Sequence, residues 1–209
     1  MLSMRDGFRL LDKYGIPTAR FAVAKNADSA AKAAKKIGYP VAIKVDSPDI
    51  VHKTDRGVVA SGITNEKELR AAVKRVMKRA GKAKAKSIIV QEHCSGKEVI
   101  IGGATDPQFG DVVLFGLGGI FVEVLKDFSI RVTPITKMDA EAMVEELRGY
   151  PLLAGVRGEE PVDIPTIVST IVKVSRMLEN EPKIKELDIN PLFVDAKGVR
   201  AADVRVITC

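Results

Sequence analysis

Two residues suited to phosphoryl chemistry lie close together in the stretch YPVAIKVDSPDIVHKTDRGVV. Lys44 falls inside the apolar run VAIKV, where an ammonium group is disfavoured unless it reaches a sheet edge or meets an anion. His52 follows in a polar segment, and an imidazole nitrogen can carry a proton or a phosphoryl group near neutral pH. The alternative is an edge-strand lysine that reaches solvent and an ordinary surface histidine. The pair is more informative than either residue alone.

A second group of candidate residues lies near the C-terminus. In ELDINPLFV, the alternation of an extended segment puts Asp188 and Asn190 on one side, and a returning strand brings Asp203 back in RAADVRV. Carboxylate and amide oxygens are the ligands that Mg²⁺ accepts while it keeps water and phosphate oxygens. The pattern predicts a Mg²⁺ site, with a polar surface cluster as the alternative.

The glycine-rich segment GLGG could contribute a phosphate loop. It matches neither the Walker pattern G-x-x-x-x-G-K-[ST] nor the dinucleotide pattern G-x-G-x-x-G. Gly118 and Gly119 could still bring backbone N–H groups close to a phosphate, because glycine tolerates close approach and positive φ. A tight turn after a strand explains the same four residues.

Composition limits the kinds of protein to consider. The 209 residues are 46% hydrophobic and 29% charged, which suits one domain, in one or two lobes. The net charge of +6 favours an anionic ligand, whereas 5% aromatic content gives little support to nucleic-acid binding. No apolar run reaches the roughly 20 residues of a membrane helix, and the two cysteines have no metal or disulfide pattern. We expect a cytoplasmic protein with no membrane partner.

Helices and strands must position these residues, and periodicity predicts both. Capping residues and apolar spacing predict the helices, while apolar runs bounded by turn residues predict the strands. The expected helices cover 28–38, 66–81, 139–149 and 167–178, and the expected strands cover 41–45, 87–92, 98–103 and 111–119. The short links HCSGK and ATDPQFG favour antiparallel neighbours, and DAKG a closing hairpin. The predicted class is mixed α/β or α+β, as one domain of residues 1–209 with lobes 1–90 and 91–209.

Longer motifs resemble a known family. They are GYPVAIKVDSPDIVHKTD, DPQFGDVVLFGLGGIFVEVLKD, RVTPITK, YPLLAGVRGEEPVD and IKELDINPLFV. They resemble the β subunit of ADP-forming acetyl-CoA or acyl-CoA synthetases, ATP-grasp proteins related to the succinyl-CoA synthetase β chain. The resemblance implies two lobes that enclose a nucleotide and conversion of acyl-CoA, ADP and phosphate into free acid, CoA and ATP. In that family the CoA-binding half is a separate α subunit or a fused domain, and for this chain the resemblance implies a separate α subunit in an α2β2 heterotetramer.

The same resemblance implies a role for individual residues. Lys44 would contact the nucleotide phosphates, and His52 would receive a phosphoryl group from an α-subunit phosphohistidine and pass it to ADP. The remaining expectations are Gln91 and Glu92 beside adenine and ribose, Glu98 as a further nucleotide contact, and Asn190, Asp203 and Asp188 around Mg²⁺.

One departure from the family pattern concerns the histidine segment. Relatives read HK[ST]DxGGV, whereas this chain reads HKTDRGVV, with Val58 in place of the second glycine. A valine removes backbone freedom from a segment that should move His52 between sites. His93 has no partner at metal-site spacing, and we expect it to have a packing or surface role.

Two other functions fit part of the sequence. A single-chain ATP-grasp carboxylate ligase would share Lys44 and the Mg²⁺ residues but would not need His52. A noncatalytic nucleotide-binding regulatory subunit would transfer nothing. The sequence does not identify the acyl group, the direction of the reaction or the stoichiometry.

Overall fold

The computed structural model describes residues 1–47, 57–81, 87–119, 126–156 and 158–209. The chain forms two compact units. The small unit comprises Ala19–Cys94, and the large unit comprises Met1–Thr18 together with Ser95–Cys209. The lobe boundary expected at residue 90 differs from this division, because residue 90 lies inside a strand and the first 18 residues pack with the C-terminal part.

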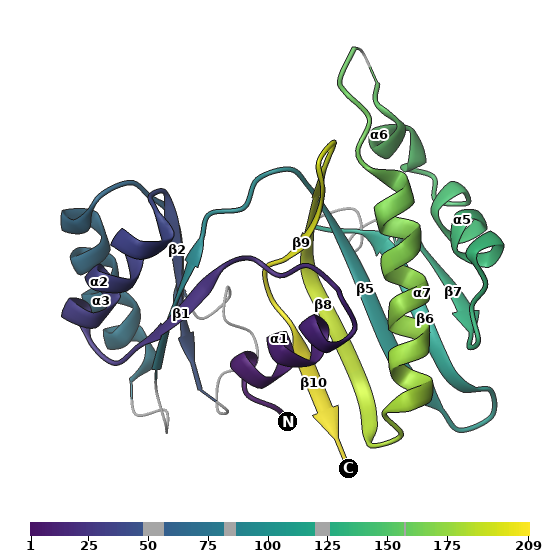
Figure 1. The fold of residues 1–209 in the computed structure, drawn as a ribbon, viewed down its shortest axis with the longest axis horizontal. Coiled ribbons are helices and arrows are strands. Elements are labelled where there is room, and N and C mark those ends of the chain that lie inside the picture. The colour runs from purple at the N-terminus through teal and green to yellow at the C-terminus, as the bar shows by residue number, and fades with distance from the viewer. Residues whose placement is uncertain (48–56, 82–86, 120–125, 157) are drawn as a thin grey trace. The chain divides into compact units, whose positions relative to one another are not determined.

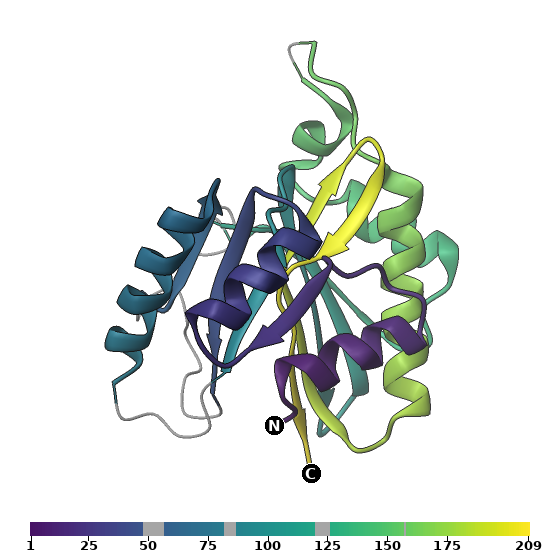
Figure 2. The same ribbon diagram turned by 60° about the vertical axis from the view of Figure 1, so that its left-hand side comes forward.

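The small unit is a four-stranded antiparallel sheet with two helices, which lie against each other in Figures 1 and 2. The strand order is β1-β4-β2-β3. The elements are β1 (Phe21–Ala24), α2 (Ala27–Ile37), β2 (Val41–Asp46), β3 (Val59–Ile63), α3 (Glu66–Ala80) and β4 (Ser87–Glu92). The helices over 28–38 and 66–81 and the strands over 41–45 and 87–92 are therefore confirmed within one or two residues.

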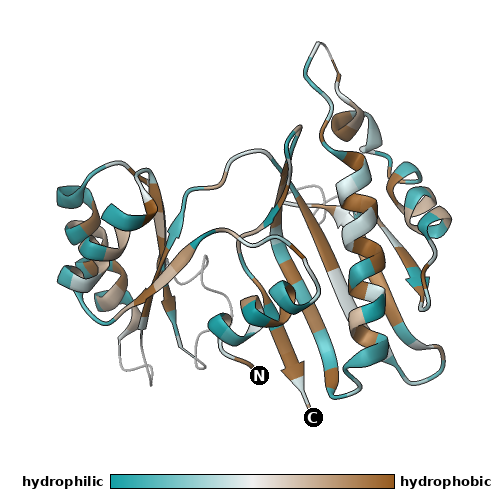
Figure 3. Ribbon diagram, in the orientation of Figure 1, coloured by the Kyte–Doolittle hydropathy of each residue, from teal (hydrophilic) through white to brown (hydrophobic). Residues whose placement is uncertain are grey.

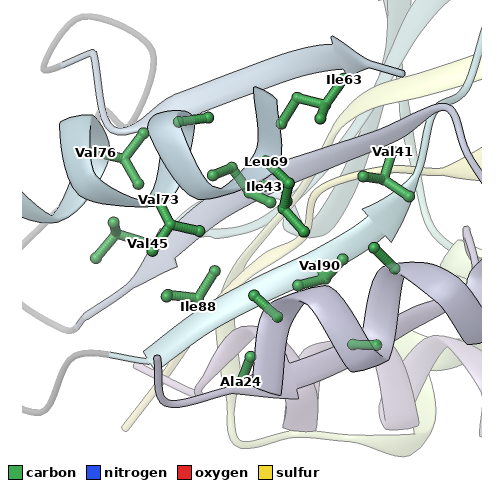
Figure 4. Close-up of a cluster of buried hydrophobic side chains, with 14 of the residues drawn as sticks. Ala24, Val41, Ile43, Val45, Ile63, Leu69, Val73, Val76, Ile88 and Val90 are labelled. Atoms are coloured by element: carbon green, nitrogen blue, oxygen red, sulfur yellow. The ribbon is translucent and has the colours of Figure 1, made fainter. Parts of the chain in front are cut away.

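The core of the small unit lies between α2, α3 and one face of the sheet. Figure 4 shows its side chains, which include Ile43, Val45, Ile88 and Val90 from the strands and Leu69, Val73 and Val76 from α3. Because side chains alternate along a strand, the intervening residues of β2 and β4 point to the opposite face. That face, called here the second face of the small sheet, carries Ala42, Lys44, Ile89 and Gln91.

A side-chain cap fixes where α2 begins, and a glycine fixes where it ends. The helix expected from residue 28 is capped by Asn26 rather than by Asp28: the Asn26 side chain accepts from the backbone N–H of Ser29, and the Ser29 hydroxyl accepts from the backbone N–H of Asn26. Both residue types cap helices well, so the sequence did not separate them. Gly38 ends α2 at a φ of 95°, as its position predicts.

The large unit is a larger antiparallel sheet whose main path runs β10-β8-β5-β6-β7, with β9 paired to β8. Figure 1 shows α7 and α5 lying across one face of it. The strands are β5 (Lys97–Asp106), β6 (Gly110–Leu117), β7 (Phe128–Val132), β8 (Ile184–Asp195), β9 (Gly198–Ala201) and β10 (Arg205–Thr208). The helices are α1 (Met4–Lys13), α5 (Lys137–Glu145), α6 (Tyr150–Ala154) and α7 (Ile164–Asn180).

The sheet of the large unit has two chemically different faces, and Figure 3 shows hydrophobic and hydrophilic residues alternating along β8. Gly103 of β5 lies directly under Leu178 of α7, and Leu187 of β8 is its neighbour in register. Gly102 is therefore on the opposite face, and so is its partner Asp188. This second face of the large sheet carries the polar residues considered below.

The structure confirms some of the hairpin connections predicted from the sequence and contradicts one of them. The hairpin around DAKG is confirmed, since β8 pairs with β9 through Asp195 and Gly198. The antiparallel pairing expected across HCSGK is wrong, because β4 and β5 belong to different sheets, whereas β5 and β6 do pair across their short link. Among the residues that the structure describes, no helix combines the length and the apolar character needed to cross a membrane.

Candidate functional site

Lys44 and Gln91 lie on the second face of the small sheet. Lys44 pairs with Ile89 across β2 and β4, and Gln91 pairs with Ala42, which makes Lys44 and Gln91 diagonal neighbours. Such neighbours lie about 7–8 Å apart, within reach of long side chains. Lys44 is only 7% exposed and Gln91 only 1%. The Gln91 Nε2 has no hydrogen-bond partner, so a buried amide donor is left without an acceptor.

Glu92, the next residue of β4, is held by an arginine of the same unit. Its carboxylate accepts from the backbone N–H of Arg20 at 2.9 Å and from the Arg20 Nε at 2.7 Å. Its own N–H donates to the Arg20 carbonyl at 2.9 Å. The side chain therefore fixes the end of β4 against the start of β1.

His52 lies outside the described residues, but the segment that follows it is described from Gly57. Gly57 has a φ of 61°, and its carbonyl accepts from Arg79 of α3 at 3.2 Å. Val58 is fully buried in the core of the small unit, and its carbonyl accepts from the Val45 N–H at 3.1 Å. Only Gly57 of the two needs a left-handed backbone, so the valine that departs from the family pattern has a packing role.

The glycines of GLGG have structural reasons for being glycine. A Cβ on Gly118 would lie 2.8 Å from the Glu98 Cβ and 3.0 Å from the Glu98 carbonyl carbon. The Gly118 N–H donates to the Glu98 carbonyl at 2.7 Å, so it is already used within the sheet. Gly119 is exposed with a φ of 62°. Glu98 itself is exposed, on the second face of the large sheet.

The acidic hairpin brings its expected residues together. The Asn190 N–H donates to the Asp203 carbonyl at 3.3 Å, in the gap between the β9 and β10 pairings with β8. Asp188 pairs in register with Arg205 of β10, two residues beyond Asp203. Asn190 is exposed and the Asp188 side chain is 36% exposed, so both can meet a ligand from solution.

The electrostatics around Asp188 favour a cation. Burial raises the pKa of its carboxyl above the usual value, and the negative charges of Asp203 and Glu186 add to that effect. Arg205 opposes it, but its guanidinium lies 4.0 Å from the Asp188 carboxylate and 3.9 Å from that of Glu186. A divalent ion near Asp188 would offset the repulsion that Asp203 and Glu186 exert on its carboxylate.

The donor set fits Mg²⁺ rather than a transition metal. Within the described ranges, no group of three or more His, Cys, Asp or Glu side chains is placed to hold a metal. Asn190, Asp188 and Asp203 offer one amide and two carboxylates, all hard oxygen donors. Mg²⁺ takes few protein ligands of this kind and completes its shell with water and phosphate oxygens.

Sequence reasoning missed Arg205 and Glu186, which flank Asp188 in space. The signal was present: Arg205 stands two residues after Asp203 and Glu186 two residues before Asp188, so alternation places both near the carboxylates. His93 is exposed, and its N–H donates to the Pro40 carbonyl at 3.1 Å, which agrees with the surface role expected for it.

These features belong to one class of protein. The sequence model of the ATP-grasp domain matches residues 1–208, and the chain is a member of that family. The fold predicted from the sequence resemblance is thereby confirmed.

Individual relatives narrow the comparison from the ATP-grasp family to one kind of enzyme. The chain is similar to the β subunit of acetate–CoA ligase [ADP-forming] I of Pyrococcus furiosus, with 48% identity over 95% of this chain and 88% of the relative. It also resembles the acetyl-coenzyme A synthetase 1 of Ca. Korarchaeum cryptofilum solved with coenzyme A and Ca-AMPCP, with a TM-score of 0.96 and 38% identity over 100% of this chain and 93% of that one. A second structure of that enzyme holds Mg-AMPPCP, with a phosphohistidine segment pointing towards its nucleotide site. Its TM-score is 0.87, at 38% identity over 100% of this chain and 92% of that one.

Proposed function

We propose that this chain is the nucleotide-binding β subunit of an ADP-forming acyl-CoA synthetase. The observation that carries the proposal is the 48% identity to such a β subunit over nearly the whole of both chains. The reaction converts acyl-CoA, ADP and phosphate into free acid, CoA and ATP. Acyl-CoA recognition belongs mainly to the partner, which therefore determines the acyl group.

Lys44 and Gln91 bind parts of the nucleotide from the small unit. A buried ammonium group beside a buried, unpartnered amide suits a ligand that brings both negative charge and hydrogen-bond acceptors. Glu92, whose carboxylate accepts from Arg20 at the end of β4, lies with Gln91 beside the adenine and ribose of this ligand. Glu98 is a side-chain candidate for a further contact.

Asn190, Asp203 and Asp188 hold Mg²⁺ with the nucleotide phosphates. The bound ion supplies charge neutralisation for the phosphate oxygens. Gly119 could offer a backbone N–H to a phosphate, whereas the N–H of Gly118 is occupied by Glu98. Positioning and charge neutralisation are what phosphoryl transfer chiefly requires.

His52 carries the phosphoryl group to ADP. A terminal phosphate oxygen of ADP attacks phosphorus, the P–N bond to the imidazole breaks, and a P–O bond of ATP forms. With the other ring nitrogen of the phosphohistidine protonated, the imidazole leaves as a neutral base, so atoms and charge balance without another reactant. The support for this role is the sequence motif HKTD, since His52 lies outside the described residues.

The partner is a CoA-binding α subunit, in an α2β2 assembly in the cytoplasm. The support is that the relative from P. furiosus is named as a β subunit, so its enzyme is divided between unlike chains. The net charge of +6 is compatible with anionic substrates.

Reconstitution tests the proposal. The chain should bind Mg·ADP on its own and should form ATP from acyl-CoA, ADP and phosphate only when the α subunit is added. ATP-dependent ligation of a carboxylate by the chain alone would favour the single-chain ligase. Nucleotide binding without any turnover in the complete assembly would favour the regulatory subunit.

A further inference from the structure

Arg205 has a buried guanidinium donor that meets no hydrogen-bond acceptor among the residues that the structure describes. It lies on β10, opposite Asp188 of β8, at the second face of the large sheet. Its Nε is buried and has no hydrogen-bond partner. Its nearest carboxylate oxygens, on Glu186 and Asp188, lie 3.9 and 4.0 Å from a terminal guanidinium nitrogen, beyond hydrogen-bonding distance.

Two other arginines of the large unit form hydrogen bonds with a neighbouring carboxylate. Arg131 donates two hydrogen bonds of 3.0 and 2.7 Å to the Glu146 carboxylate, and Arg200 donates one of 2.7 Å to the Asp195 carboxylate. A buried guanidinium donor that meets no acceptor is costly, so the position of Arg205 calls for an acceptor that the described residues do not supply.

A phosphate oxygen has the chemistry that this donor lacks. The guanidinium is planar, permanently charged and suited to two parallel hydrogen bonds with a phosphate. Glu186, Asp188 and Asp203 alone would repel a nucleotide phosphate, and Arg205 is the cation that acts on Asp188 among them. The Mg²⁺ donors Asn190 and Asp203 lie on the same hairpin, where the phosphates of a magnesium nucleotide would be.

We propose that Arg205 binds a terminal phosphate oxygen of the magnesium nucleotide and stabilises the charge that spreads over the transferring phosphoryl group. The inference rests on the proposed function and adds a substrate-contacting residue to it. The transferring phosphoryl group carries negative charge on its equatorial oxygens. A fixed guanidinium beside these oxygens therefore lowers the activation barrier for ATP formation and for the reverse reaction.

The test compares the affinity for the nucleotide with the affinity for a divalent metal alone. A phosphate-binding role of Arg205 predicts that only the nucleotide affinity falls, whereas a role in supporting Asp188 predicts that both fall. Arg205→Gln removes the charge and leaves a shorter polar side chain, and Arg200→Gln, the same change on the same sheet, is the matched control. Titration calorimetry of the full chain should show Mg·ADP and Mg·ATP affinities about 10- to 100-fold weaker in Arg205→Gln and unchanged in Arg200→Gln. Electron paramagnetic resonance should show that Arg205→Gln binds Mn²⁺ alone as tightly as the wild type or more tightly, because the variant lacks a positive charge near the carboxylates.

Other results would overturn the assignment. Parallel loss of Mn²⁺ and nucleotide affinity would make Arg205 a support for Asp188, and unchanged nucleotide affinity would remove it from the site. Arg205→Lys, which keeps the charge without the planar fork, should lose part of the affinity and covers the case in which the glutamine variant does not fold. Absence of nucleotide binding in the wild type would instead contradict the proposed function.

Discussion

The backbone N–H of Asn190 donates to the backbone carbonyl of Asp203 at 3.3 Å, across two arms of the hairpin that ends the chain. This bond lies where β8 passes from its pairing with β9 to its pairing with β10. The bond keeps the backbone of Asn190, in β8, next to that of Asp203, in the link between β9 and β10, and Asp188 is two residues before Asn190. The proposed Mg²⁺ site therefore has two of its three residues joined through the backbone.

The first prediction concerns this Mg²⁺ site. A saturating Mg·ADP concentration of about 100 times the dissociation constant should stabilise the wild-type chain by about 2.7 kcal/mol and raise its thermal midpoint by roughly 5–10 °C. Asp203→Asn should lose most of this rise, because the metal loses a charged ligand. Differential scanning fluorimetry with and without EDTA measures it. An equal rise in both proteins would remove Asp203 from the site.

The second prediction concerns the close contact between Gly118 and Glu98. Gly118→Ala should reduce the free energy of unfolding by about 1–3 kcal/mol, because its Cβ would lie 2.8–3.0 Å from the Cβ and backbone of Glu98. Gly102→Ala is the matched control, since its Cβ would find only ordinary contacts at 3.6 Å or more and its φ is not positive. Urea denaturation compares them. Normal stability with lost nucleotide affinity in Gly118→Ala would instead assign Gly118 to the phosphate.

Local signals in the sequence account for much of the fold. The helix α3 could be predicted because its apolar residues recur at helical spacing, and those residues, Leu69, Val73 and Val76, form the core of the small unit. The link between β4 and β5 could not be predicted in the same way. Its length suits a hairpin, but the chain there passes from one sheet to another, and which sheet a strand joins depends on distant residues.

The site was predictable to the extent that residue type and alternation determine it. Asp188 and Asn190 were found because an extended segment puts alternate residues on one side. The orphaned Nε of Arg205 and the buried amide of Gln91 could not be foreseen, because the absence of a hydrogen-bond partner is a property of the folded chain. The same holds for the Gly118 N–H, whose use by Glu98 depends on the register of β5 and β6.

The third prediction concerns Val58, the valine in place of the usual second glycine. Val58→Gly should lower the free energy of unfolding by about 2–4 kcal/mol, since it removes a fully buried side chain from the small-unit core and adds backbone freedom to the unfolded chain. Val23→Ala, at a 45% exposed position of β1, should change stability by less than about 0.5 kcal/mol. Equal stability of Val58→Gly and wild type would mean that Val58 does not pack as described.

The fourth prediction concerns pH and the contact between α1 and the end of α7. Hydrogen bonds from Lys13 and Tyr14 hold the pKa of Glu181 below its usual value. A carboxyl whose pKa is lower in the folded state adds stability above its unfolded pKa and loses it as pH falls through the folded pKa. Glu181→Gln should therefore lower the thermal midpoint at pH 7 by about 1–3 °C, a small effect because the pair is solvent-exposed.

The Glu181→Gln difference should vanish in strong acid, where the wild-type carboxyl is protonated too. Glu145→Gln, at an exposed position of α5, is the control and should follow the wild type at every pH. Thermal scans from pH 2 to pH 7 measure both variants. A difference that persists unchanged at pH 2 would show that the carboxylate charge is not what stabilises the contact.

The last prediction concerns His52 and the phosphoryl relay. With the α subunit, acyl-CoA and labelled phosphate, the wild-type chain should acquire a label that is stable in base and labile in acid, as a phosphoramidate is. His52→Ala should abolish the label on this chain and ATP formation, while Mg·ADP affinity stays within about threefold of wild type, because the imidazole transfers the group and does not hold the nucleotide. His93→Ala, which changes the other histidine of the chain at an exposed position, should keep both activities. Near-normal ATP synthesis by His52→Ala would mean that the α-subunit phosphohistidine reaches ADP directly, and collapse of Mg·ADP binding would make His52 a binding residue.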